Sequence, residues 1–145
     1  MLRIVLAALH LLALGIGLGA VWSRARLLGG RFDSGAVRRA LVVDSWWGVA
    51  AVVWLATGLW RLFAATEKAT TYYMTNRVFF AKMGMFVLVL ILEIGPMITL
   101  LRWRRGMQPD ASAAKRIATI SYVECLLVIA MVVAAVAMAR GYGVR

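Results

Sequence analysis

The sequence predicts an all-α integral membrane protein, an up-down four-helix bundle. Hydrophobic residues make up 63% of the 145 residues, well above the roughly 45–50% that is usual in soluble proteins. Four apolar runs are each long enough to cross about 30 Å of hydrocarbon, where a backbone satisfies its hydrogen bonds as a helix. The connections between the runs are short, so neighbouring helices must alternate in direction. We therefore expect residues 1–145 to form a single transmembrane domain.

The four predicted helices cover residues 4–22, 41–63, 78–101 and 117–139. The first run is longer than the apolar region of a typical signal peptide and no small-residue cleavage site precedes Arg24, so we expect it to be retained. Within it, the small residues Ala13, Gly17 and Ala20 predict a face on which another helix packs closely.

Positive charges predict the orientation of the bundle. Ten Lys and Arg residues flank the connections after the first and third runs, whereas five lie on the other side. The positive-inside rule then predicts an N-out and C-out protein surrounded by the lipid bilayer. Because topology accounts for these charges, the net charge of +11 does not indicate a nucleic-acid partner.

One layer of polar residues is expected near the outer face. His10 and Lys82 lie at similar depths in the first and third helices, and Arg61 and Trp54 share a face of the second. A lone imidazole opposite a second lone-pair donor can hold haem b, so His10 and neutral Lys82 are candidate ligands. Arg61 is a candidate partner of a propionate, and Trp54 is a further candidate cofactor-binding residue. Alternatively, His10 only hydrogen-bonds to another helix and Lys82 extends to the headgroups.

A second layer is expected in the inner half of the membrane. Glu93 and Glu124 lie at matched depth, and Asp44 lies nearer the cytoplasm. These acids are candidates for sharing or relaying a proton, or for binding a cation. Alternatively, they form ion pairs with Arg24 and Arg102 that only fix how the helices align.

Sulfur-containing residues give a weaker signal. The single cysteine, Cys125, cannot form an internal disulfide, and it lies in an apolar helix as a packing residue would. The eight methionines form no tight cluster around His10 or Cys125, so the sequence provides little support for a copper site.

Several segments resemble known membrane families. D-S-W-W-G at 44–48, L-E-I-G-P-M at 92–97 and M-A-R-G at 138–141 resemble an uncharacterised family of bacterial four-span membrane proteins, a domain of unknown function. This resemblance implies a multi-pass protein of the bacterial inner (cytoplasmic) membrane. A-L-H at 8–10 and K-M at 82–83 are similar to HemJ-type protoporphyrinogen oxidases and to CopD-like membrane proteins. The HemJ resemblance implies haem b and catalytic or ligand roles for His10 and Lys82, although the other segments do not match HemJ.

These observations lead to three functional hypotheses. The first is a haem b-binding membrane oxidoreductase or electron-transfer protein, with Lys82 and Arg61 as catalytic candidates and a quinone or porphyrinogen as partner. The second is a non-enzymatic accessory or scaffold subunit, in a homo-oligomer or a larger membrane complex. The third is a cation or copper carrier that uses the buried acids.

Overall fold

The computed structural model describes residues 1–64 and 70–143. These residues form five helices: α1 (Leu2–Gly29), α2 (Ser34–Phe63), α3 (Thr70–Thr75), α4 (Arg77–Arg104) and α5 (Ala111–Ala139). All except the short α3 are long and apolar enough to cross a membrane. The predicted all-α architecture with four candidate membrane spans is confirmed, and α3 is an additional element that hydropathy did not predict.

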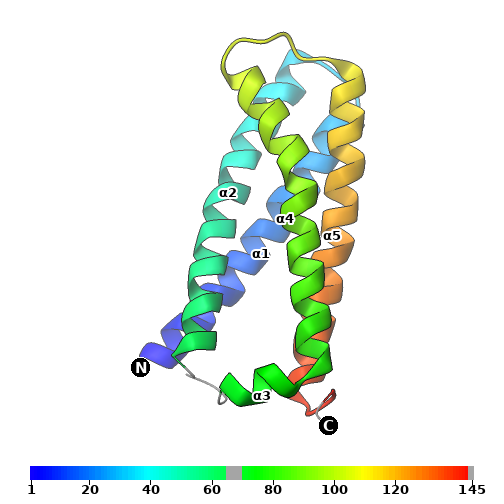
Figure 1. The fold of residues 1–145 in the computed structure, drawn as a ribbon. Coiled ribbons are helices and arrows are strands. Elements are labelled where there is room, and N and C mark those ends of the chain that lie inside the picture. Colours follow the sequence, from blue (N-terminus) through cyan, green and yellow to red (C-terminus); the bar gives the residue numbers. More distant parts are fainter. Residues whose placement is uncertain (65–69, 144–145) are drawn as a thin grey trace.

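The four long helices form an up-down bundle in which α1 packs against both α2 and α5, and α4 packs against α5. Figure 1 shows the α1–α2 and α4–α5 connections together at the top, and the N-terminus and α3 at the bottom. We call these the loop end and the terminal end. The two basic connections therefore lie at the same end of the molecule, as the charge count requires. Which side of the membrane this end faces stays a prediction.

The helices extend beyond the predicted apolar runs at the loop end. α1 continues to Gly29, whereas α2 and α5 begin at Ser34 and Ala111 rather than at 41 and 117. The carboxylate of Asp33 accepts a hydrogen bond from the backbone N–H of Ala36, and Asp110 caps α5 in the same way through Ala113. A helix begins where a cap satisfies its first N–H groups, whereas hydropathy detects only the section that faces lipid. The predicted helices were therefore too short at the loop end.

Small residues let α1 and α2 approach closely, as predicted. A Cβ atom added at Gly17 would lie 3.1 Å from the Trp47 ring and 3.5 Å from the Ala50 methyl group. Ala13 and Ala20 are also buried. Close contact between α1 and α2 therefore depends on the absence of a side chain at position 17.

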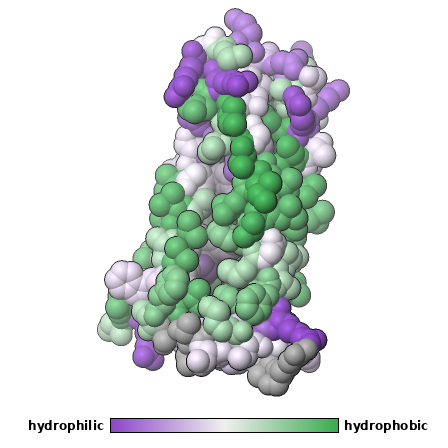
Figure 2. Space-filling view, viewed as in Figure 1, coloured by the Kyte–Doolittle hydropathy of each residue, from purple (hydrophilic) through white to green (hydrophobic). Residues whose placement is uncertain are grey.

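The outside of the bundle is apolar along most of its length. Figure 2 shows a broad hydrophobic belt, with hydrophilic residues concentrated at the loop end and fewer at the terminal end. Large aliphatic side chains such as Leu11, Val52 and Leu126 are well exposed on this belt. A surface of this kind is stable against lipid tails and unfavourable in water, so it supports a bilayer as the surroundings of the protein.

Candidate functional site

A buried arginine joins all four long helices. Arg24 on α1 is fully buried, and its guanidinium lies 2.8 Å from Asp44 on α2, 2.7 Å from Glu93 on α4 and 2.8 Å from Glu124 on α5. Its Nε–H also donates to the hydroxyl of Ser121 on α5 at 2.9 Å. We call Arg24, Asp44, Glu93 and Glu124 the Arg24 cluster.

The Arg24 guanidinium uses its whole hydrogen-bonding capacity. Nη1 donates to Asp44 and to Oε1 of Glu93, and Nη2 donates to Oε2 of Glu93 and to Oε2 of Glu124. Together with the bond from Nε to Ser121, five N–H groups have five acceptors. Glu93 is held by two parallel bonds, which is the strongest arrangement of an arginine and a carboxylate. This complete set of partners allows a guanidinium to be buried.

Local sequence places these side chains. Arg24 belongs to a buried stripe on α1 that also contains Val21, Ala25 and Leu28. On α5, Ser121 and Glu124 are three residues apart, so they lie on one face and meet the same guanidinium. Ion pairs between Arg24 and the three acids were one of the two alternatives that the sequence left open, and the structure contains them. The sequence analysis missed Ser121, although its spacing from Glu124 was a signal.

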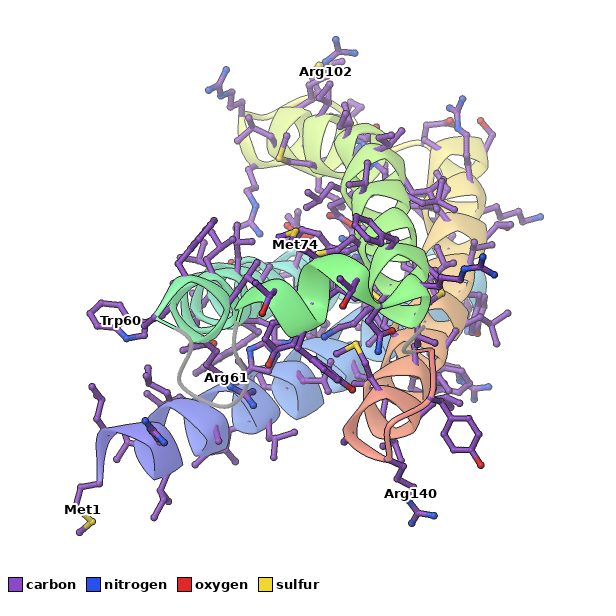
Figure 3. The ribbon with its side chains drawn as sticks, turned by 60° about the horizontal axis from the view of Figure 1, so that its bottom comes forward. Met1, Trp60, Arg61, Met74, Arg102 and Arg140 are labelled. Carbon is purple, nitrogen blue, oxygen red and sulfur yellow. The ribbon has the colours of Figure 1, made fainter. Side chains whose placement is uncertain are left out.

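A second arginine reaches the edge of the cluster. Nη2 of Arg104 lies 3.1 Å from Oδ2 of Asp44 and also donates to the backbone carbonyl of Leu41. Arg102, the predicted second counter-ion, is instead exposed and points away from the bundle (Figure 3). Positions two residues apart point about 200° apart around a helix. Depth alone therefore could not decide between Arg102 and Arg104.

The Arg24 cluster has more acids than bases. Three carboxylates face the guanidinium groups of Arg24 and Arg104, which leaves one negative charge in excess if all are ionised. Glu124 is fully buried, and its Oε1 has no hydrogen-bond partner among the described residues. A buried carboxylate oxygen without a donor is unfavourable, whereas a protonated oxygen removes the excess charge. The cluster is therefore suited to bind one proton.

A different polar layer lies nearer the terminal end, where His10 packs against α2. The His10 ring stacks on Trp54 with centroids 5.5 Å apart, and Nδ1 lies 3.1 Å from the Trp54 carbonyl oxygen and 3.0 Å from Oγ1 of Thr57. A Cβ atom at Gly58 would lie 3.1 Å from Cε1 of His10, so glycine allows this approach. The predicted hydrogen bond from His10 to another helix is confirmed, with Thr57 and the Trp54 carbonyl as its partners.

The contact with the Trp54 carbonyl favours the tautomer of His10 that carries a proton on Nδ1. A backbone carbonyl only accepts, so this contact requires Nδ1 to donate, whereas the Thr57 hydroxyl lies within hydrogen-bond distance of Nδ1 and of the carbonyls of Val53 and Trp54. In this tautomer the neutral ring holds its lone pair on Nε2, which is the arrangement found in many metal-bound histidines.

Cationic and aromatic side chains surround this layer. Lys82 on α4 is partly buried and lies within electrostatic range of Arg61 on α2. Trp54 meets Phe86 of α4 edge-on, with centroids 5.6 Å apart. Figure 3 shows Arg61 directed toward the bundle and the neighbouring Trp60 directed away from it. The structure thus places His10 against α2 and Lys82 near Arg61.

Comparison with known proteins identifies the family. A family model described as "Predicted membrane protein (DUF2214)" matches residues 2–143. The chain belongs to the DUF2214 family. No curated protein and no solved structure matches this DUF2214 protein. The predicted membership of an uncharacterised membrane family is confirmed, and the distant similarity to HemJ-type and CopD-like proteins stays a prediction from short motifs.

The described residues of this DUF2214 protein contain no group of side chains typical of a metal site. Within residues 1–64 and 70–143, no three His, Cys, Asp or Glu side chains are grouped as a metal site would require. The three acids of the Arg24 cluster surround a guanidinium, which occupies the position that a bound cation would need. A cation carrier using these acids would first have to displace Arg24.

Proposed function

We propose that this DUF2214 protein is a proton-linked membrane protein in which the Arg24 cluster binds and releases one proton. The observation that carries the proposal is the fully buried Glu124, whose Oε1 has no hydrogen-bond partner among the described residues. It lies in a cluster whose three carboxylates face only two arginines, Arg24 within the cluster and Arg104 at its edge. With Glu124 protonated, Asp44 and Glu93 are balanced by Arg24 and Arg104. Loss of that proton would leave an uncompensated charge in a medium of low dielectric constant.

Exposure within the cluster suggests the route of the proton. Glu124 is fully buried, the side chains of Asp44 and Glu93 are 17% and 18% exposed, and that of Arg104 at the loop end is 35% exposed. A proton would therefore pass between Glu124 and the loop end by way of Asp44 or Glu93. The positive-inside rule leads us to propose that this end faces the cytoplasm of a bacterium, with both termini outside.

Infrared spectroscopy tests the proposed proton directly. In purified protein at neutral pH, we expect a carbonyl band of a protonated carboxylic acid that shifts in D₂O. Glu124→Gln, Glu93→Gln and Asp44→Asn should each abolish the band, because two remaining acids balance two arginines. Asp110→Asn is the matched control, since Asp110 is an exposed acid outside the cluster.

Two outcomes would contradict the proton proposal. One is a folded parent protein without the carbonyl band across the neutral range. The other is a band that persists in all three cluster variants. Either result would favour the accessory or scaffold hypothesis, in which the Arg24 cluster only fixes the packing of the helices.

A second candidate function is haem b binding at His10, which the geometry of Nδ1 favours. The bond from Nδ1 to the Trp54 carbonyl would orient the ring and present the Nε2 lone pair, as second-shell partners do for histidine ligands. Neutral Lys82 would supply the second lone pair, and Arg61 would bind a propionate. Bound haem would provide one-electron chemistry with a quinone or porphyrinogen, and the chain would orient and shield it.

An oxidised-minus-reduced visible spectrum tests the haem proposal. Protein produced with sufficient haem should show Soret and α-bands that His10→Ala abolishes. Thr57→Val is the matched control, because the Trp54 carbonyl still accepts from Nδ1 in this variant. A colourless parent protein, or bands that survive His10→Ala, would overturn haem binding at His10 and leave the proton proposal unaffected.

A further inference from the structure

A groove between α1 and α2 at the loop end is separate from both polar layers. It has a volume of about 760 Å³ and is shallow, with most of its extent open to the surroundings. Its basic lining residues are Arg26, Arg38 and Arg39, and its apolar lining includes Trp22, Leu27 and Val42. None of the described residues that line it is acidic.

The three arginines of the groove are available for a ligand. Arg26, Arg38 and Arg39 are exposed, and none has an ion-pair partner among the described residues. Arg24, only two positions before Arg26, instead uses all of its N–H groups inside the bundle. Arg24 and Arg26 thus have different roles, and the three arginines of the groove form an exposed positive surface, in which Nη1 of Arg39 and the carboxylate of Asp33 both lie beside Gly35.

The charged and apolar parts of the groove lie at different depths. α1 runs toward the loop end, so Arg26 lies nearer that end than Trp22, one helical turn earlier. α2 runs away from the loop end, so Arg38 and Arg39 lie nearer it than Val42. The basic part therefore lies at the polar edge of the hydrophobic belt, and the apolar part extends into the belt.

We propose that this groove binds an anionic phospholipid of the leaflet at the loop end. The guanidinium groups of Arg26, Arg38 and Arg39 would hold the phosphate, for which their planar donors are well suited. The acyl chains would lie along Trp22 and Val42, both of which are exposed on the belt. Basic pockets between transmembrane helices recognise anionic headgroups by this combination of charge and depth.

Lipid titration followed by native mass spectrometry tests this proposal. Delipidated protein should bind phosphatidylglycerol more tightly than phosphatidylcholine. The triple variant Arg26→Gln/Arg38→Gln/Arg39→Gln should weaken phosphatidylglycerol binding on the order of a hundredfold, at about a factor of five for each arginine. The matched control is Arg102→Gln/Arg105→Gln/Arg116→Gln, which removes three exposed charges from the other connection at the same end.

The control and a competition experiment decide between the outcomes. Weakened binding in the groove variant alone, with an unchanged unfolding temperature, would support the site. Equal weakening in both variants would overturn it, because general surface charge would then explain the attraction. Displacement of the lipid by inorganic phosphate at similar concentrations would also overturn it, since the apolar part of the groove would then contribute nothing.

Discussion

The two buried polar layers of the bundle differ in charge and in what they connect. The Arg24 cluster near the loop end has an excess of acid, and its ion pairs join α1, α2, α4 and α5. The layer nearer the terminal end contains His10, Arg61 and Lys82, and the hydrogen bonds of the His10 side chain join α1 to α2. The network of ion pairs that joins the four long helices therefore lies in the half of the bundle near the loop end.

This difference indicates how the other half is held together. Near the terminal end, hydrogen bonds link α3 and the N-cap of α4 to the end of α5 and the turn after it: the Asn76 amide donates to the carbonyl of Tyr142, and the Tyr72 hydroxyl donates to the carbonyl of Met138. The backbone N–H of Arg77 also donates to the carbonyl of Gly143. Hydrogen bonds between neutral groups stabilise less than charge-assisted bonds, so we expect these three bonds to open more easily than those of the Arg24 cluster.

The largest expected effect is that of Arg24→Leu, which removes the centre of the Arg24 cluster. Three buried or partly buried carboxylates would lose their common partner, so the free energy of unfolding should fall by about 3–5 kcal/mol. Denaturant or thermal unfolding in detergent measures the change. Arg26→Leu, at an exposed arginine two positions later, should change stability little, and equal losses in the two variants would contradict the assigned role of Arg24.

At the terminal end, Gly143→Ala should be the most damaging of the small substitutions. Gly143 has a φ of +87°, and an added Cβ would lie 2.5 Å from Cγ2 of Val78 and 2.6 Å from Oδ1 of Asn76. Strain and overpacking together predict a loss of about 3 kcal/mol. Gly141→Ala provides the control, because Gly141 has a φ of +88° and no neighbour within 4 Å of its Cβ position. The difference between their unfolding temperatures isolates the contact with α4.

Asn76→Ala tests the hydrogen bonds at the same junction. The buried Asn76 side chain accepts from the N–H groups of Val78 and Phe79, which caps α4, and donates to Tyr142. Loss of the cap and of this bond should cost about 2 kcal/mol. The neighbouring Thr75→Ala should be almost neutral, since the exposed Thr75 hydroxyl bonds only to its own helix. If hydrogen exchange at the start of α4 is equal in both variants, the junction does not depend on Asn76.

The smallest expected effect is the pH dependence of the α5 cap. The Ser112 hydroxyl and the backbone N–H of Ala113 hold the pKa of Asp110 below its ordinary value of 3.8. Because the folded pKa is the lower one, the cap contributes fully above pH 3.8 and its contribution is lost as pH falls through the folded pKa. Hydrogen exchange in the first turn of α5 should therefore rise only in strong acid, and Asp110→Asn should remove that dependence.

Much of the architecture could be predicted because hydropathy and depth follow directly from sequence. The four spans, the close approach at Gly17 and the meeting of Arg24 with Glu93 and Glu124 all depend on helical rise and apolar length. Other features depend on rotation about helix axes, which one sequence does not specify. Two contacts depend on this rotation: Asp44 pairs with Arg104 rather than Arg102, and His10 has Thr57 as a hydrogen-bond partner.

The position of Arg24 on the first helix has a consequence for biogenesis. During synthesis Arg24 emerges 20 residues before Asp44, 69 before Glu93 and 100 before Glu124. Until α4 and α5 are inserted, its charge must remain near the interface, where a long side chain can reach water and headgroups. Burial of Arg24 is therefore a late step that follows synthesis of the last helix. The same ion pairs that fix the folded bundle would make a chain truncated before α5 a poorly packed membrane protein.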